Sequence, residues 1–325
     1  MPFNPRDTTT FEQVRLAVEQ FEQILFRSGI EIISGSPLEA ICLNLLELER
    51  GQEHPNMSGK MEDLRLAYRS ALGFHDILRR IVRLGAHPNF HVFLDHIRLL
   101  NTTGTLAQNV AAPTDQIAAK IFELLIGLIC LEVGTDVRLD GPVKSYGDNP
   151  DVIVNIGGRT WGFACKVLGG YSPITMFERL EEGVKQIDRS SAEIGCVVFN
   201  LKNQIDHDET WPILNPIEYA AGDETPTYGN WKSLDGPLNI FRSLARQRQD
   251  SLVQINGADS VRMLFAGSKS IHGALLFLQT AIGLKLRKEP LVNMVLGLFS
   301  LADLGGVSSE EFAVLDRLNN AMHHR

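Results

Sequence analysis

The sequence has no excess of basic residues. Among its 325 residues, 31 lysines and arginines stand against 39 aspartates and glutamates, which leaves a formal charge of −8. Proteins that bind nucleic acid or an anionic membrane without specificity rely on a broad positive surface. The composition excludes such a surface over the protein as a whole, so any site for nucleic acid must be local.

Paired cysteines and long apolar runs are missing as well. No cysteines form a Cys-x-x-Cys pair, and each lies in an apolar run, which argues against disulfides and structural zinc and predicts buried, reduced thiols. They are Cys42, Cys130, Cys165 and Cys196. The most apolar stretches, 121–131 and 291–302, are shorter than the about 20 residues that span a membrane, and the chain begins without an apolar signal segment. We therefore expect a soluble, cytoplasmic protein with no membrane partner.

The first hundred residues have helical periodicity. A capping box at Thr9 and another at Ser36 each open a helix whose apolar residues recur at helical spacing. The same spacing predicts two more helices, over about 62–83 and 89–100. A polar stretch, Asn-Thr-Thr-Gly-Thr, ends this part. We therefore predict an all-helical N-terminal domain over residues 1–105.

Charge is divided unevenly within these helices. Residues 1–59 carry four basic and nine acidic side chains, whereas residues 60–105 carry seven basic and four acidic ones. A basic helix face in the second stretch could hold a phosphate backbone. The alternative, which charge runs generally favour, is a solvated helix face with pairs four residues apart, such as Asp76 and Arg80.

From Pro113 onward, helical and strand-like segments alternate, which is typical of an α/β domain. We predict a helix over 115–133, a strand near 136–139, two strands around Gly157-Gly158, a helix from Thr175 to about Ser191, and buried strands over 195–201 and 261–266. Residues 203–257 are rich in proline, glycine and acid and look like an insertion. A capping box at Ser308 predicts a last helix. The second domain would span residues 106–325.

The predicted helix over 115–133 contains one anomalous charge. Glu123 is the only charged residue between Ile121 and Leu131. A buried carboxylate takes up a proton unless a cation lies close to it. Glu123 should therefore meet a cation in the fold, and the alternative is that it reaches the helix edge beside Lys120.

The Gly157-Gly158 turn determines the register of the two strands that it joins. In a hairpin with a two-residue loop at this position, residues whose numbers sum to 315 face each other, so Asp151 lies opposite Ala164. Side chains alternate along a strand, so odd-numbered residues of the second strand would face one core layer and even-numbered ones the other. Asp151, Ala164 and Lys166 then share one face of the hairpin.

These residues resemble the motif of the PD-(D/E)XK nucleases, which have the restriction-endonuclease-like fold. The family pattern is a helix with a glutamate, Pro-Asp at the start of a strand, an acid, any residue and lysine on the next strand, then a helix and further strands. Glu123, Pro150-Asp151 and Lys166 occur in that order, with Ala164 at the position of the acid. The resemblance covers about residues 113–201 and implies a mixed central sheet flanked by helices.

The resemblance also implies roles for the site residues. Asp151 would bind Mg²⁺ or Mn²⁺ together with the backbone carbonyl of Cys165, and Glu123 would lie at the edge of the metal site. Lys166 would orient or deprotonate the attacking water. Lys185 and Gln186, on the next helix, would touch the substrate. A hard cation held by oxygen ligands neutralises the charge that develops during phosphodiester hydrolysis.

Ala164 stands where the family has its second metal-binding acid. It is compatible with an engineered Glu→Ala change, which the otherwise intact motif favours, with a natural pseudo-nuclease, or with an accidental match. We expect a catalytically impaired, Mg²⁺-dependent nuclease that acts on nucleic acid, DNA rather than RNA, in a setting such as restriction or anti-phage defence. The alternative is a noncatalytic subunit that binds nucleic acid or a protein partner, or a homo-oligomer, through the N-terminal helices.

Overall fold

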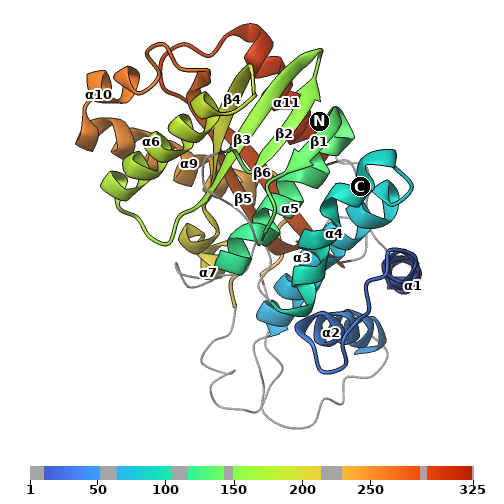
Figure 1. Cartoon of the computed structure of the whole chain (residues 1–325). Helices are drawn as coiled ribbons and strands as arrows, with labels where there is room; N and C mark the ends of the chain where they lie inside the picture. The colour runs from blue at the N-terminus through green and yellow to red at the C-terminus, as the bar shows by residue number, and fades with distance from the viewer. Residues whose placement is uncertain are drawn as a thin grey trace.

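The computed structural model describes residues 11–51, 64–103, 116–142, 149–213, 229–285 and 291–323. Within these ranges, a six-stranded sheet lies between two layers of helices (Figure 1). Each strand pairs with its sequence neighbour, in the order β1-β2-β3-β4-β5-β6. The strands are β1 (Thr135–Leu139), β2 (Val152–Ile156), β3 (Arg159–Val167), β4 (Ile194–Asn200), β5 (Ser270–Lys285) and β6 (Leu291–Asp303).

The sheet is mixed. Strands β1, β2 and β3 form an antiparallel meander, β3, β4 and β5 are parallel to one another, and β6 returns antiparallel to β5. A parallel neighbour requires a crossover connection, which the helix α6 (Pro173–Arg189) provides between β3 and β4. The predicted α/β class, with a mixed sheet flanked by helices, is therefore confirmed.

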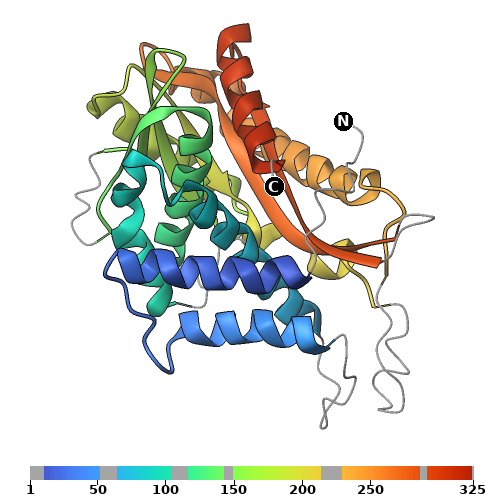
Figure 2. The same ribbon diagram turned by 90° about the vertical axis from the view of Figure 1, so that its right-hand side faces the viewer.

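Two hydrophobic cores lie on the two faces of the sheet. The first joins α1, α2, α3, α5 and α11 to one face, and the second joins α6, α9 and α10 to the other. The helices α1 and α2 lie side by side (Figure 2), and both contact α3, which itself packs on α5, β5 and β6. The N-terminal helices thus continue the core of the sheet, while the predicted boundary after residue 105 lies outside the described residues.

The remaining helices have the following bounds: α1 (Phe11–Arg27), α2 (Pro37–Gly51), α3 (Leu64–Leu84), η2 (Pro88–Phe93), α4 (Leu94–Arg98), η3 (Leu99–Asn101), α5 (Gln116–Val133), η4 (Lys202–Gln204), α7 (His207–Thr210), α9 (Asp235–Asn256), α10 (Ala258–Met263) and α11 (Ser309–His323). The helix predicted over 89–100 is therefore broken into an α-helical turn between two 3₁₀ segments. The helices predicted over 62–83 and 115–133 are confirmed as α3 and α5, within the described residues.

The predicted capping box at Ser308 is complete, whereas the one at Ser36 is half formed, because the Glu39 carboxylate accepts the N–H of Gly35 rather than that of Ser36. The hydroxyl of Ser36 accepts the N–H of Glu39 at 3.2 Å. At the start of α11, the hydroxyl of Ser308 accepts the N–H of Glu311 at 3.2 Å, and the Glu311 carboxylate accepts the Ser308 N–H at 2.8 Å. These bonds satisfy N–H groups that a helix leaves without an internal partner. The predicted box at Thr9 lies outside the described residues.

The predicted strand over 261–266 is wrong. These residues form the end of α10 and a turn, and the next strand begins at Ser270. A short apolar run does not distinguish a buried strand from a buried helical turn. Val261 and Phe265, four residues apart, pack together into the second core, as helical spacing requires. The strands β5 and β6, the two longest of the sheet, are not among those predicted from the sequence.

Two further predictions need correction. The helix α6 begins before Thr175, because Ser172 is its N-cap, with its hydroxyl accepting the Thr175 N–H at 3.3 Å. Residues 203–257 are not wholly an insertion, since α9 packs Phe241 and Leu252 into the second core. Residues 214–228 of that stretch lie outside the described part of the chain.

The thiols follow the prediction. All four cysteines are free, and three of them are buried while Cys165 is partly exposed. Burial raises the pKa of Cys42 and of Cys196 to about 12, so both thiols stay protonated at neutral pH.

None of the helices in the described ranges combines the length and apolarity that crossing a bilayer requires.

We predict that Gly183→Ala destabilises the protein. At Gly183, α6 lies so close to the sheet that a Cβ atom would be 2.7 Å from Val197 Cγ2 and 3.3 Å from Ala164 Cβ. Alanine gains up to about 1 kcal/mol in helix propensity, but overpacking a core costs about 1–3 kcal/mol. Urea unfolding should therefore show a net loss of stability. Gly170→Ala, where a Cβ meets nothing within 4 Å, is the control, and a gain in stability for Gly183→Ala would contradict the prediction.

Candidate functional site

The β2–β3 hairpin has the predicted register. Paired residues across the ladder have numbers that sum to 315. Gly157 and Gly158 both have positive φ, 65° and 83°, which a tight hairpin turn of this length requires. Asp151, one residue beyond the last ladder pair, lies opposite Ala164 by this register. The Oδ2 atom of Asp151 accepts the N–H of Cys165 at 2.6 Å, which ties the two strands at this end.

Side chains along β3 alternate between the two cores as predicted. Phe163 belongs to the core on the α5 side, and Ala164 belongs to the core on the α6 side. Lys166 also faces α6, where its Nζ donates to Gln186 Oε1 at 2.8 Å and to Glu182 Oε1 at 3.2 Å. The Lys166 side chain is 10% exposed. The helix α6 therefore holds the ammonium group near the carboxyl end of β3.

Glu123, on α5, has the cation that its burial requires. Its Oε2 atom accepts a hydrogen bond from Lys120 Nζ at 2.8 Å, while the Glu123 side chain is only 5% exposed. Burial raises the pKa of Glu123, and the Lys120 cation opposes that rise. The sequence left two possibilities, a buried Glu123 with a nearby cation and a Glu123 that reaches the helix edge beside Lys120. In the structure Glu123 stays buried, and Lys120 is the cation that pairs with it.

His96 is a site residue that the sequence patterns do not indicate. It is 1% exposed, it belongs to α4, and its Nε2 lies 3.5 Å from Glu123 Oε2. Burial, reinforced by the Lys120 charge, lowers the pKa of His96 to about 4, so the ring is neutral at pH 7. His91 is five residues away and on another helix face, so no metal-ligand spacing points to His96. Only the packing of α4 on α5 brings it to the site.

Asp151 and Glu123 form a coupled pair of buried carboxyl groups. Asp151 is 8% exposed, and the charge of Glu123 acts on it. Burial first, and then the charge of Glu123, raise the pKa of Asp151 to about 8, while the Lys166 charge acts in the opposite direction. The Asp151 carboxyl therefore holds a proton at neutral pH.

This raised pKa predicts a pH dependence of stability. The carboxyl of Asp151 has a folded pKa of about 8, above the about 3.9 of an unfolded aspartate. The folded state thus holds the proton more tightly, so the contribution is present at acid pH and is lost as the pH rises from about 4 to about 8. Asp151→Asn keeps a neutral side chain and does not titrate. Its unfolding free energy should fall less over this range than that of the unsubstituted protein.

Urea unfolding at several pH values, without added metal, measures this difference. Asp259→Asn, which removes a carboxylate that is 96% exposed, controls for the loss of one charge. Parallel pH profiles for Asp151→Asn and the unsubstituted protein would contradict the coupled pair.

The helix α6 separates the two residues predicted to touch the substrate. Gln186 is 7% exposed and accepts a hydrogen bond from Lys166, so it lies at the site. Lys185 is 56% exposed and pairs with Glu181 at 2.8 Å along the outer face of the helix. Neighbouring helix positions point in different directions. Glu182, rather than Lys185, lies at the site beside Gln186. It is one helical turn from Gln186 on the same face of α6, and both side chains accept a hydrogen bond from Lys166.

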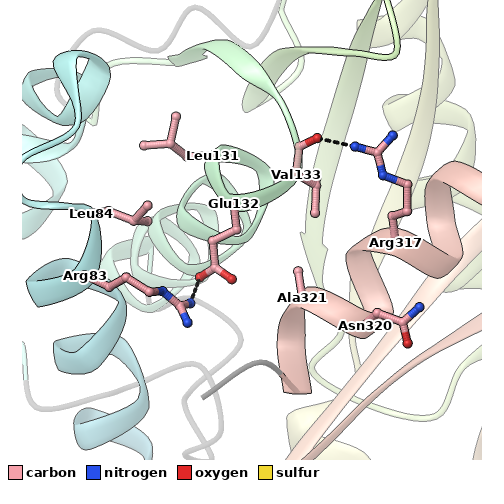
Figure 3. Close-up of a pocket in the computed structure, with 8 residues that line it drawn as sticks. All are labelled: Arg83, Leu84, Leu131, Glu132, Val133, Arg317, Asn320 and Ala321. Atoms are coloured by element: carbon pink, nitrogen blue, oxygen red, sulfur yellow. Dashed lines mark hydrogen bonds and ion pairs between the residues drawn. The ribbon is translucent and has the colours of Figure 1, made fainter.

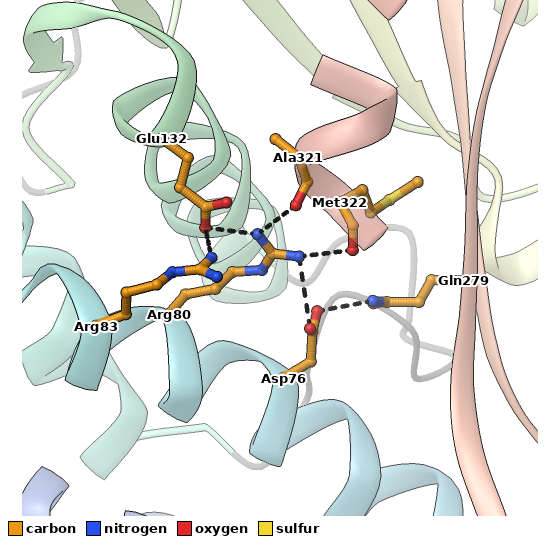
Figure 4. Close-up of polar contacts among 7 residues, drawn as sticks. All are labelled: Asp76, Arg80, Arg83, Glu132, Gln279, Ala321 and Met322. Atoms are coloured by element: carbon orange, nitrogen blue, oxygen red, sulfur yellow. Dashed lines mark hydrogen bonds and ion pairs between the residues drawn. The ribbon is translucent and has the colours of Figure 1, made fainter. Parts of the chain in front are cut away.

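The basic residues of α3 are largely used in contacts inside the protein. Arg80 is 2% exposed and binds Asp76 at 3.5 Å and Glu132 at 2.7 Å (Figure 4). Arg65 is also buried and pairs with Asp208 at 2.7 Å. The predicted pair of Asp76 and Arg80 is therefore present, but it lies in the interior rather than on a solvated face. A phosphate-binding face on these buried arginines finds no support.

A cleft of about 650 Å³ opens between α3, α5 and α11 (Figure 3). At its rim, Arg83 pairs with Glu132, and Arg317 donates to the carbonyl oxygen of Val133 at 2.6 Å. Val133 is the last residue of α5, about 15 Å along the helix from Glu123 at 1.5 Å per residue. This cleft is therefore separate from the site around Asp151 and Lys166.

The donor atoms of this site do not form a complete set of ligands for a divalent metal ion. The resemblance assigns the metal to Asp151, Glu123 and the carbonyl of Cys165, but Lys120 is already bound to Glu123, and Ala164 supplies no ligand. Across the described ranges, no group of three or more histidine, cysteine, aspartate or glutamate residues is arranged to hold a metal ion. The residues that the resemblance assigns to Mg²⁺ or Mn²⁺ therefore do not form such a site in the described part of the chain.

The site as a whole combines two buried acids, a neutral histidine and a lysine at one end of the β2–β3 hairpin. It can hold a proton on Asp151 and present an ammonium group to an anion. Comparisons of the chain with protein-family models, with curated proteins and with solved structures find no match.

Proposed function

We propose that the chain has the scaffold of a metal-dependent nuclease of the PD-(D/E)XK kind, in a catalytically impaired form. The observation that carries the proposal is the β2–β3 register, which brings Asp151 opposite Ala164. Ala164 is two residues before Lys166 on β3, so these two side chains are on the same face of the strand. Glu123, on α5, lies close enough for its charge to raise the pKa of Asp151. These are the positions of the family motif, with only the acid at 164 missing.

The topology supports the same proposal. The elements α5, β1, β2, β3, α6 and β4 follow one another in the chain, with an antiparallel meander and then a parallel fourth strand. The resemblance calls for a helix, the two motif strands, a helix and further strands, which α5, β2, β3, α6 and β4 supply in that order, with β1 as an additional strand between α5 and β2. We therefore assign a restriction-endonuclease-like fold to residues 116–200 as part of the proposal.

Lys166 is the residue that would bind the scissile phosphate. Its ammonium group is oriented by Gln186 and Glu182, so little side-chain freedom remains to be lost when an anion binds. Ala164 leaves the acids short of one carboxylate, so the protein would bind a phosphodiester without cutting it. DNA as the preferred nucleic acid, and a role in restriction or anti-phage defence, remain predictions.

The second candidate is a noncatalytic protein that binds nucleic acid through the same fold. It is favoured by the lack of a complete metal-ligand group in the described ranges. The two candidates differ in one respect, because only an impaired nuclease regains activity when the acid is restored.

Restoring that acid is the experiment that tests the proposal. The Ala164→Glu variant should cleave single- or double-stranded nucleic acid in the presence of Mg²⁺, and a chelator should stop the reaction. A folded variant that stays inert on DNA and RNA would favour the noncatalytic candidate.

A further inference from the structure

A second cleft, of about 560 Å³, opens between the segment after β4 and the helix α9. Its apolar lining includes Ile205, Phe241 and Leu244, and Tyr171 also lines it. Tyr171 follows Lys166 by five residues, in the segment beyond the carboxyl end of β3. Ligands of open α/β sheets commonly bind beyond the carboxyl ends of the strands, in pockets of about 300–1,000 Å³.

The ring of Tyr171 is held in place although it is 56% exposed. The guanidinium of Arg248 lies 4.7 Å from the ring centroid and covers part of the ring. The Tyr171 hydroxyl donates to the carbonyl oxygen of Gln204 at 3.3 Å, and its own carbonyl accepts from Arg248 at 3.2 Å. An exposed aromatic ring fixed in this way can stack on a planar ligand with little loss of entropy.

Gln204 supplies an acceptor without a partner beside the same cleft. Its side chain is 3% exposed, and its Nε2 donates to the carbonyl of Gly170 at 2.6 Å, which fixes the orientation of the amide. The Oε1 atom is buried and has no hydrogen-bond partner. A buried acceptor left unpaired is unfavourable, because it has lost its hydrogen bonds to water. A ligand N–H group that reaches Oε1 would remove this penalty.

The charge of the lining excludes a phosphate as the occupant. Asp206 and Glu209 line the cleft, and its described lining residues include no lysine or arginine. Carboxylates repel phosphate but accept hydrogen bonds from amino groups. The cleft therefore suits a neutral, planar group with N–H donors.

We propose that this cleft binds one unstacked nucleobase, which stacks on Tyr171 and donates from its exocyclic amino group to Gln204. The inference rests on the proposed function and narrows the substrate to a nucleic acid with an unpaired base. A base in an intact duplex is stacked and paired on both sides, so it reaches such a cleft only from a single strand or after flipping.

Fluorescence of 2-aminopurine tests the proposal, since this base carries an exocyclic amino group and is quenched when it stacks. The probes are 2-aminopurine deoxyriboside and a single-stranded oligonucleotide that contains one such base, each titrated with the full chain. We expect saturable quenching by the unsubstituted protein. Tyr171→Ala should weaken binding about 5- to 150-fold, since stacking is worth about 1–3 kcal/mol per base, and Tyr171→Phe should retain it.

Phe312→Ala is the matched control, because Phe312 is also an exposed aromatic residue, 54% exposed, on α11. Purine deoxyriboside, which lacks the amino group, should bind about tenfold more weakly than the 2-amino probe if Gln204 is its acceptor. Inorganic phosphate should not compete with the free deoxyriboside.

The outcomes separate this inference from the nuclease proposal. Quenching that is absent, or that is equal in Tyr171→Ala and the unsubstituted protein, overturns the base cleft even if Ala164→Glu cleaves DNA. Quenching that depends on Tyr171 supports base binding in this cleft. If the Ala164→Glu variant is then inert, that result contradicts the nuclease proposal but not the base-binding inference. Preference for an intact duplex over the single strand would also overturn the inference.

Discussion

Replacing Ala164 with glutamate is expected to produce a Mg²⁺-dependent cleavage of nucleic acid about a thousandfold faster than that of the Ala164 protein. The added carboxylate would be the third acid beside Asp151 and Glu123. Regaining about 4 kcal/mol of transition-state stabilisation corresponds to a thousandfold in rate. The measurement is the initial rate of cleavage of labelled single- and double-stranded substrates, with and without Mg²⁺.

Packing around Ala164 determines how this experiment is designed. Ala164 is fully buried, and a Cβ atom at Gly183 of α6 would lie 3.3 Å from the Ala164 Cβ, so a longer side chain has little room on the α6 side. Ala164→Asp, with a shorter side chain, is the second variant. A carboxylate added outside the site by Ser191→Glu is the matched control and should give no activity.

Two removals identify the site that performs the cleavage. Lys166→Ala or Asp151→Asn, each combined with Ala164→Glu, should abolish the regained activity. Activity that survives both removals would belong to a contaminant or to another site. Folded Ala164→Glu and Ala164→Asp variants without activity on any substrate would refute the nuclease proposal.

The largest effect on stability is expected for Arg80→Leu, at about 3–5 kcal/mol of unfolding free energy. Arg80 is buried and binds Asp76, Glu132 and the carbonyl oxygens of Ala321 and Met322, at 3.3 and 2.9 Å (Figure 4). It therefore joins α3 to α5 and to the carboxyl end of α11. Removing one partner of a buried ion pair leaves the others desolvated without compensation, which accounts for the magnitude. Urea unfolding followed by circular dichroism measures it.

Arg83→Leu is the matched control on the same helix. Arg83 also pairs with Glu132, but its side chain is 41% exposed, so its removal should cost at most about 1 kcal/mol. Arg80→Lys should lie between the two, because lysine keeps the charge but lacks the planar fork that serves several acceptors. Equal losses for Arg80→Leu and Arg83→Leu would contradict the argument from burial.

The sequence by itself determined the features that depend on neighbouring residues. The Gly157-Gly158 turn specified the hairpin register, because a two-residue loop permits only one pairing, and that register placed Asp151 opposite Ala164. The capping boxes at Ser36 and Ser308 are local as well, since each is a bond between residues three apart. Because the neighbours of Glu123 in the sequence are apolar, its carboxylate was expected to pair with a cation. Lys120, one helical turn away, is that cation.

Tertiary structure alone decided the features that depend on distant contacts. His96 reaches Glu123 only because α4 packs on α5, and Arg80 is buried only because α5 and α11 close over α3. Val261, at the end of α10, and Phe265, in the turn after it, both pack into the second core, although the same short run is compatible with a strand. The physical reason is common to these cases: burial and pairing are set by the packing of distant segments, whereas periodicity and turn chemistry report only on residues close in the chain.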